Sequence, residues 1–250
     1  MPEYLLLRFE APLMSFGAPT VDQQGVIQPF PALSMIAGLF ANALGFDHAD
    51  HDATQHLQRR IRYAVRADRP GEALRDYQTV DLGQDFMVDT GWTTRGVLEE
   101  RGSGEATSGT HIRYRDYWAD ALFLVAVELA DGTPTLENIS HALDWPARPL
   151  FLGRKTCLPS VPVRWKQVEA TGLLAALTRE PLLTTQGWPG LNGSRDGSTK
   201  LRAWWPDGEA GAPDSVVFPV TDERDWRNQI HGGRRLVRHG LINLEVAANG

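Results

Sequence analysis

The sequence contains almost no cysteine and no long hydrophobic run. Cys157 is the single cysteine among 250 residues, which excludes an intrachain disulfide and a zinc site built from several thiolates. The most apolar stretch, residues 123–130, is far shorter than the roughly 20 residues that a membrane-spanning helix requires. Glu3 stands where a secretory signal carries basic residues, so we expect a cytoplasmic chain that does not bind a membrane.

Lysine is also scarce, and the common phosphate-binding loop is missing. Lysine occurs at positions 155, 166 and 200, so 22 of the 25 basic residues are arginine, which GC-rich coding explains as well as phosphate recognition does. The Walker A pattern does not occur, and the glycines of residues 102–109 lack the strand-to-helix context of a nucleotide-binding loop. A net charge of −6 argues against a free-standing, non-specific nucleic-acid binder, but it allows one basic face on an acidic molecule.

Titratable residues gather in two places. Residues 47–56, DHADHDATQH, contain three histidines and three aspartates, and their spacing would let two histidines reach one metal ion from a helix. A solvated loop that leads into a short helix is the simpler interpretation, and we expect neither a metal nor an organic cofactor. His111, Tyr114 and Tyr117, with Lys155 near in space, would offer the base and acid of a metal-independent ribonuclease. Cys157 is expected to be a small buried packing residue rather than a nucleophile.

Hydrophobic periodicity predicts alternating strands and helices over the first 166 residues. Ser34 is the expected N-cap of the first helix, and Gly45 is its expected C-cap. Alternation along residues 61–68 places Arg62 and Arg66 on the face away from the core. The elements expected in chain order are a strand at 4–10, a helix at 34–45, strands at 61–68 and 74–80, an insertion, a strand region at 111–129, a helix at 133–145 and an extended segment at 148–166.

This order approximates the β-α-β-β-α-β pattern of a ferredoxin-like domain, so we predict an α+β fold with that core in residues 1–166. Residues 81–110 interrupt the pattern with glycines and little periodicity, which fits either a disordered insertion or a projecting hairpin. A helix at 168–180 and the strands that follow it predict a small β-rich region over residues 167–250.

Two stretches combine positive charge with aromatic rings. Residues 148–166, RPLFLGRKTCLPSVPVRWK, contain five basic residues and no carboxylate, and residues 113–118 combine two arginines with two tyrosines and a tryptophan. Guanidinium groups pair with phosphates and rings stack on unpaired bases, so the two stretches together favour an RNA-binding surface. For each stretch alone, the alternative is a solvated strand edge, where charge discourages aggregation.

Four stretches of the sequence resemble one known family. They are YLLLRFEAPLMSFG (4–17), FPALSMIAGLFANALG (30–45), LRDYQTV (74–80) with RYRDYWADA (113–121), and PLFLGRKTC (149–157). In this order they resemble the CasD family of the RAMP superfamily, the subunit of type I-E CRISPR Cascade that binds the 5′ handle of crRNA. The resemblance implies a ferredoxin-like core on the handle and a long thumb hairpin, at about residues 81–110, that contacts the backbone subunit. It also implies that the protein lies near the large subunit of the complex and contacts target DNA only indirectly.

Carried over by position, the resemblance implies a set of RNA-facing residues. Together with Arg113 from the basic and aromatic stretch, they are Met14, Ser15, Phe16, Gly17, Ser34, Arg75, Tyr77, Arg115, Tyr117, Gly153, Arg154 and Lys155. Gly153 would let the backbone approach a phosphate closely. The first helix would offer its free N–H groups, at Ser34, to an anion.

The sequence departs from the family pattern in two motifs, and the chain is also longer than the family leads us to expect, mainly at the thumb and towards the C-terminus. Residues 32–35 read Ala-Leu-Ser-Met where relatives carry Thr-Arg/Lys-Ser-Gly, so one expected phosphate contact is missing. Gln78 stands where relatives often carry a histidine, which removes a possible general base.

We therefore expect a non-catalytic, crRNA-binding subunit of a CRISPR interference complex, which leaves target readout to pairing with the guide. One alternative is a metal-independent endoribonuclease that processes precursor crRNA, as type I-C relatives do. The other is a protein-interaction module with incidental arginines.

Overall fold

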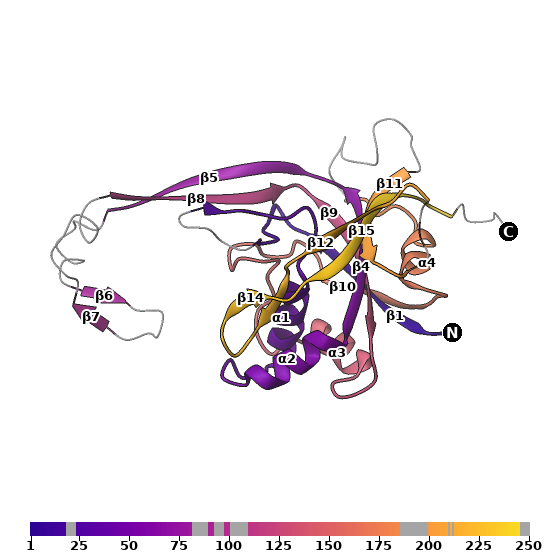
Figure 1. Cartoon of the computed structure of the whole chain (residues 1–250), viewed down its shortest axis with the longest axis horizontal. Coiled ribbons are helices and arrows are strands. Elements are labelled where there is room, and N and C mark those ends of the chain that lie inside the picture. Colours follow the sequence, from indigo (N-terminus) through magenta and orange to yellow (C-terminus); the bar gives the residue numbers. More distant parts are fainter. Residues whose placement is uncertain are drawn as a thin grey trace.

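The structure is a computed structural model with a mixed α/β fold that is mainly sheet (Figure 1). It describes residues 1–18, 24–81, 110–185, 200–209, 211 and 213–245, and the backbone alone of residues 90–92 and 98–100. None of the helices in these ranges is long and apolar enough to cross a membrane.

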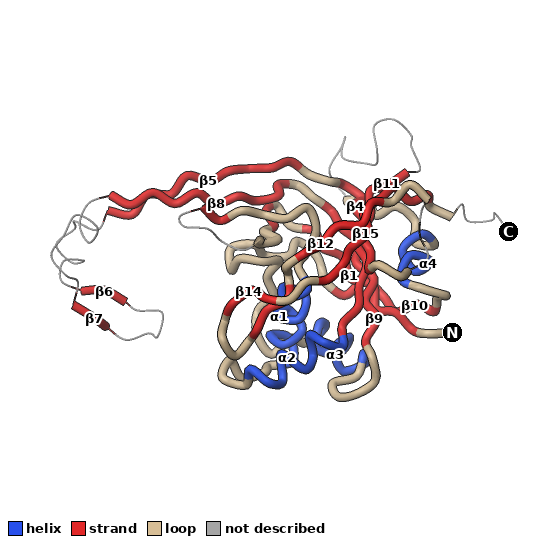
Figure 2. The backbone as a smooth tube through the Cα atoms, in the orientation of Figure 1, coloured by secondary structure: helices blue, strands red, loops and turns tan. Residues whose placement is uncertain are grey.

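A seven-stranded antiparallel sheet forms the body of the molecule (Figure 2). Its strands, from one edge to the other, are β10 (Arg164–Glu169), β1 (Glu3–Glu10), β9 (Leu122–Leu129), β4 (Ile61–Arg69), β11 (Lys200–Pro206), β15 (Arg235–Asn243) and β12 (Val216–Val220). The helices are α1 (Leu33–Leu44), α2 (His51–Arg60), α3 (Leu136–Asp144) and α4 (Leu173–Thr178). The expected strands at 4–10 and 61–68 and the expected helices at 34–45 and 133–145 are thus confirmed.

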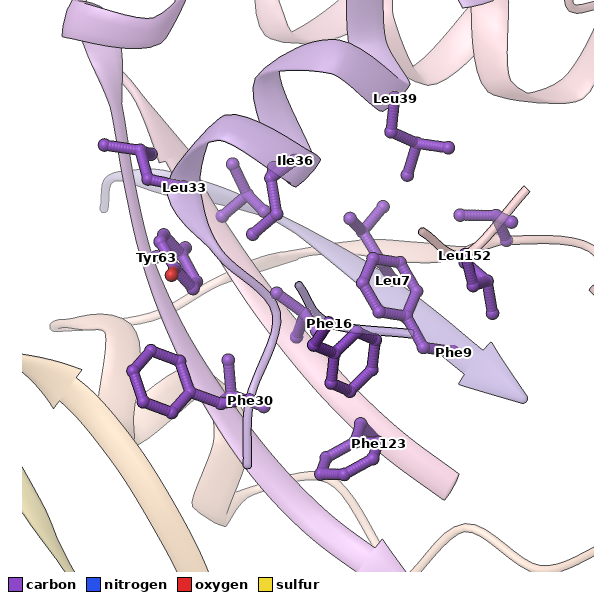
Figure 3. Packing of buried hydrophobic residues seen from close by; sticks show 14 of the residues in the cluster. Leu7, Phe9, Phe16, Phe30, Leu33, Ile36, Leu39, Tyr63, Phe123 and Leu152 are labelled. Carbon is purple, nitrogen blue, oxygen red and sulfur yellow. The ribbon is translucent and has the colours of Figure 1, made fainter. Parts of the chain in front are cut away.

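The central strands of the sheet are buried on both faces. Along β1, Leu5 and Leu7 pack into a core with α1, α2 and α3, whereas Tyr4 and Leu6 pack into a second core with α4. Figure 3 shows the first core, in which Phe16 of a neighbouring loop meets Phe123 of β9 edge to face at 5.2 Å. Strands covered on both faces are apolar at consecutive positions, which explains the continuous hydrophobic run at residues 123–127.

Burial on both faces corrects the expected exposure of Arg66. Arg62 is exposed as expected, but Arg66 is fully buried under the chain that follows α4. Its guanidinium forms a two-pronged ion pair with Asp68 and donates to the Leu177, Glu180 and Pro181 carbonyl oxygens. These partners make burial of the charge tolerable.

The C-terminal strands extend this same sheet. β11 pairs with β4, and β15 and β12 follow it outward, so residues 200–243 add three strands to the edge of the N-terminal strands. The boundary expected between residues 166 and 167 falls inside β10. The helix expected at 168–180 is shorter, because residues 168 and 169 belong to β10 and α4 spans Leu173–Thr178.

A second sheet leaves the body as a ribbon. β5 (Glu72–Asp81) pairs along its whole length with β8 (Thr110–Ala119), and the two strands project together (Figure 1). β2 (Leu13–Met14) and β3 (Gln24–Gly25) also pair with β8. The insertion expected at 81–110 is continuous with this ribbon. Within it β6 (Thr90–Trp92) pairs with β7 (Leu98–Glu100), and residues 82–89, 93–97 and 101–109, with the glycine-rich tip, lie outside the described residues.

The single strand region expected at 111–129 is two strands in two different sheets. Asp120, with a left-handed φ of 52°, separates β8 from β9, and Gly71, with a φ of 71°, separates β4 from β5. A side chain at Gly71 would meet the Ala119 carbonyl oxygen at 2.5 Å, so the two breaks lie side by side. Both strands of the ribbon therefore turn away from the main sheet at one place.

The N-terminus of α1 is capped by a residue from the far end of the sequence. Ser34 is not the N-cap, because the helix begins one residue earlier and Ala32 in the cap position makes no side-chain hydrogen bond. Instead, Leu33 donates its N–H to the Asp222 carboxylate at 3.0 Å, and Ser34 donates its N–H to the Asp222 carbonyl oxygen at 3.0 Å. The predicted C-cap is confirmed, since Gly45 adopts a φ of 77°.

Asp222 is fully buried and is paired with a cation. Arg235 of β15 donates to both of its carboxylate oxygens, at 2.7 and 2.6 Å. The Tyr63 hydroxyl, between them, donates to the Pro31 carbonyl oxygen at 2.6 Å. Burial raises the pKa of the Tyr63 phenol well above its usual range, so this hydroxyl stays a donor. One carboxylate thus joins α1, β4 and β15.

Replacing Asp222 with alanine should therefore destabilise the fold strongly. The change leaves the Arg235 charge buried without its partner and uncaps α1, at a cost of about 3 kcal/mol or more in the free energy of unfolding. Chemical denaturation of the variant and wild type measures the difference. Asp207→Ala is the matched control, because Asp207 and Arg238 are each about one-third exposed, and such pairs contribute about 0–1 kcal/mol. Equal losses in the two variants would contradict this account.

Candidate nucleic-acid interface

A cleft of about 860 Å³ opens beside α1. It lies between the loop at residues 15–18, one face of α1, the chain between α1 and α2, the segment 148–155, and the hairpin of β13 (Glu223–Asp225) and β14 (Ile230–Gly232). Six of the residues expected to face RNA line this cleft, namely Ser15, Gly17, Ser34, Gly153, Arg154 and Lys155.

The cleft is cationic although the protein is acidic. Arg148, Arg154, Lys155 and Arg224 line it, with His48, His51 and His231, against the single carboxylate of Asp47. In the part of the chain that the structure describes, none of the four cations forms a salt bridge with a carboxylate. Positive charge on the walls of a concave surface attracts anionic ligands.

Arg154 is held in place by neutral partners. Its guanidinium donates to the Asp116 and Gly25 carbonyl oxygens at 2.8 and 2.9 Å and lies 4.7 Å from the centre of the Tyr117 ring. Arg115 also reaches Gly25, where a side chain would lie 3.0 Å from its Nη1 and 2.6 Å from Arg154 Nη2. Two guanidinium groups thus converge at Gly25. Lys155, the next residue, is exposed.

The basic stretch at 148–166 does not form one surface. Arg164 is paired with Asp144 at 2.6 Å, and Lys166 is paired with Glu180 at 2.7 Å. Arg148 donates to the Phe46 carbonyl oxygen at 2.9 Å and lines the cleft together with Arg154 and Lys155. Only the first three of the five cations therefore belong to the cleft.

The register of the ribbon divides the expected groove residues between two faces. Arg75 lies opposite Asp116 and Tyr77 lies opposite Tyr114, so these side chains share one face. Arg113, Arg115 and Tyr117 alternate onto the other face, which is the one that Arg154 contacts. Arg75 and Tyr77 therefore do not line the groove with Arg115 and Tyr117, and this expectation is wrong in its geometry.

The charge of Arg75 is compensated on its own face. Arg75 donates to Asp116 at 2.7 and 3.0 Å and lies 5.7 Å from the Tyr114 ring centre. These hydrogen bonds lower the pKa of the Asp116 carboxyl and raise that of Arg75. Tyr77 remains 56% exposed beside this pair.

Four other expected contacts are limited by burial. The Met14 and Phe16 side chains are fully buried in the first core, so at most their backbone faces the cleft. Tyr117 is 5% exposed and covered by Arg154, which leaves no free ring for a base to stack on. Ser15 is 3% exposed, although it lines the cleft.

The two expected backbone contacts to phosphate are both occupied by the chain itself. Gly153 has a φ of 102°, and a side chain there would lie 1.8 Å from the Ser15 carbonyl oxygen. The close approach that this glycine permits is thus to Ser15, not to a phosphate. At the start of α1, Asp222 accepts the hydrogen bonds of the Leu33 and Ser34 N–H groups, so those donors are not free for an anion.

The histidine-rich segment at 47–56 forms a loop and the start of α2, as the simpler interpretation predicted. Asp50 is the N-cap of α2 and accepts the Ala53 N–H at 3.0 Å. His48 and His51 face the cleft, and the described residues contain no group of three or more side chains suited to a metal ion. Cys157 is buried, as expected, and burial raises the pKa of its thiol.

The candidate ribonuclease residues do not converge. His111 and Tyr114 are three residues apart on β8, which places them on opposite faces. Lys155 follows Arg154, which contacts Tyr117. Six residues of strand place His111 about 20 Å along β8 from that point.

The residues that sequence reasoning missed come from the C-terminal hairpin. Arg224, Trp226 and His231 line the cleft, yet they lie some 70 residues beyond Lys155 in the sequence. The local pattern DERDWRNQIH does combine arginines with a tryptophan, which is the signal that pointed to residues 113–118.

The chain is similar to proteins of CRISPR systems. The profile of a family described as CRISPR-associated protein (Cas_Cas5) matches residues 4–238. The CRISPR system Cascade subunit CasD of Escherichia coli strain K12 is 30% identical over 166 residues, which cover 63% of this chain and 67% of that protein.

Two solved structures share the fold. A chain of a CRISPR RNA-guided surveillance complex matches with a TM-score of 0.65 at 24% identity, over 96% of this chain and 90% of that chain. A crystal structure of a Cas protein matches with a TM-score of 0.61 at 25% identity, over 96% and 95% of the two chains.

Replacing Gly153 with alanine should displace the cleft wall. The added methyl group would collide with the Ser15 backbone, and the left-handed conformation is itself unfavourable for alanine. We expect a loss of about 2 kcal/mol or more in the free energy of unfolding. Gly17→Ala is the control, because a side chain there meets no atom within 4 Å. Equal unfolding midpoints for the two variants in urea would show that the approach of residues 15 and 153 is not needed.

Proposed function

The chain belongs to the CRISPR-associated Cas5 family, and we propose that it is a non-catalytic subunit of a type I Cascade complex that binds the 5′ handle of crRNA. The handle would lie in the cationic cleft beside α1. The observation that carries this proposal is the set of four cleft cations that lack a carboxylate partner among the described residues of an acidic protein. RNA phosphates would supply the missing negative charge.

The arrangement of the first four strands of the seven-stranded sheet supports a ferredoxin-like core. In chain order they are β1, β4, β9 and β10, with α1 and α2 after the first and α3 after the third. In the sheet, β9 lies between β1 and β4, and β10 lies outside β1. This is the order that a split β-α-β-β-α-β unit produces. Residues 1–166 would supply this core, and residues 200–243 would extend it.

The ribbon supports a role as the thumb that contacts the backbone subunit. β5 and β8 project from the body (Figure 1), and β5 is exposed along nearly its whole length. Leu74, Tyr77 and Val80 are each more than 40% exposed there. Apolar side chains on a projecting element are typical of a surface that another protein covers. Other surfaces of the protein would contact the large subunit, and target DNA would be contacted only indirectly. The complex would act in the cytoplasm.

Binding in the cleft predicts a steep salt dependence that Arg154 and Lys155 control. With about four cations on single-stranded RNA, log K should fall against log salt with a slope of about −3. Changing Arg154 and Lys155 together to alanine should flatten that slope by more than about one unit. Fluorescence anisotropy of labelled handle RNA at several salt concentrations measures both slopes.

The matched control is the double change of Arg164 and Lys166 to alanine. It removes the same charge from the same stretch of sequence, but both residues are paired with carboxylates outside the cleft. Its slope should equal that of wild type. If Arg154→Ala impairs folding, Lys155→Ala alone should still flatten the slope by about 0.7. Equal slopes for all variants would remove the cleft from the proposal.

The alternative function, cleavage of precursor crRNA, is tested by incubation with repeat RNA in EDTA. We expect no cleavage, since His111 and Tyr114 lie on opposite faces of β8 and Lys155 is distant along the ribbon. Gel electrophoresis of the RNA checks this. Cleavage by wild type that His111→Ala abolishes would overturn the non-catalytic proposal.

A further inference from the structure

The hairpin of β13 and β14 forms a wall of the cleft and is fixed firmly to the helices. Gln58 of α2 donates to the Arg224 carbonyl oxygen at 3.0 Å and accepts from the Trp226 Nε1 at 3.0 Å. Gln55 accepts the Trp226 N–H at 3.2 Å. The Trp226 ring lies so close to α1 that a side chain at Gly38 would be 3.3 Å from it. The hairpin is therefore a fixed wall of the cleft.

Arg224 and His231 lie directly opposite each other in this hairpin. The register pairs the two residues, so their side chains share one face, and both line the cleft. The Arg224 Nε and the His231 Nδ1 are buried and have no hydrogen-bond partner among the described residues. Buried polar nitrogens are almost always bonded, so each of these two neighbours has an unused bonding position that a ligand or a water molecule would fill.

The guanidinium of Arg224 is held in position by neutral groups, without a carboxylate among the described residues to balance its charge. It lies 5.4 Å from the Trp226 ring centre and donates through Nη2 to Gln229 at 2.6 Å. Within the described ranges it has no carboxylate partner. Burial lowers the pKa of Arg224, as expected for a cation without a counter-charge. A partly buried cation of this kind is stabilised when an anion binds to it.

We propose that Arg224, with His231 beside it, is a phosphate-binding site for the RNA backbone on the C-terminal wall of the cleft. Arg154 and Lys155 bind phosphates from the wall formed by residues 148–155, so the strand is bound from two separate segments of the chain. The inference rests on the proposed function, because the phosphate belongs to the handle. It gives the C-terminal hairpin a direct part in RNA binding.

The test compares Arg224→Gln with wild type for binding to labelled handle RNA across a range of salt concentrations. Loss of one charged phosphate contact should weaken binding about tenfold at low salt and flatten the salt slope by about 0.7. Arg224→Lys should keep the slope, because it keeps the charge, and should recover part of the affinity.

Arg227→Gln is the matched control from the same hairpin. Arg227 is exposed, paired with Asp52 at 2.9 Å, and does not line the cleft. Its affinity and slope should match those of wild type. Wild-type binding that Arg224→Gln leaves unchanged would overturn this inference and leave the proposed function intact. No salt-sensitive binding by wild type would overturn both.

A second measurement needs no substitution and covers the case in which Arg224→Gln does not fold. Ultraviolet cross-linking of the handle RNA to wild-type protein, followed by mass spectrometry, should give linked peptides from residues 224–231 as well as 148–155. Cross-links in 148–155 with none in 224–231 would contradict the proposed site.

Discussion

The buried ion pair between Asp222 and Arg235 is the interaction on which the cleft depends. Asp222 caps α1 through its carboxylate and its carbonyl oxygen, while Arg235 fixes that carboxylate to β15. Because β13 follows Asp222 directly, the same pair sets where the hairpin meets α1 and α2. A carboxylate at a helix N-terminus is favourable by itself. Here it also occupies the donors that an external anion would otherwise use, so anions are left to the side chains of the walls.

The division of charge within the molecule follows from this arrangement. Outside the cleft, Arg62, Arg66, Arg164 and Lys166 are matched by carboxylates, whereas Arg59, Arg202 and Arg234 form no salt bridge among the described residues. The four cleft cations bond to carbonyl oxygens or an amide, or are exposed, and none forms a salt bridge with a carboxylate in the described part of the chain. A cationic cleft on an acidic protein is suited to a polyanion, and the acidic remainder disfavours binding elsewhere.

Local pattern predicted the elements well, and long-range pairing explains what it missed. Strands 4–10 and 61–68, helices 34–45 and 133–145, and the Gly45 cap follow from periodicity and turn chemistry. The N-cap of α1 could not be predicted from local pattern, because the capping residue is Asp222, far along the chain. The faces of the ribbon could not be predicted either. The register pairs odd-numbered positions of β5 with even-numbered positions of β8, so Arg75 and Tyr77 lie on the opposite face from Arg115 and Tyr117. This information belongs to the pairing of two strands, not to either strand. The family resemblance located the segments at 15–17 and 153–155, but the residues at 224–231 required the fold.

The most direct test of the cleft as the RNA site is a crystal structure of this protein with a handle oligoribonucleotide. The account predicts phosphate oxygens within hydrogen-bonding distance of Arg154 and Lys155, with RNA between them and α1. RNA bound instead across the ribbon face that carries Arg75 and Tyr77, with the cleft filled only by water, would contradict it.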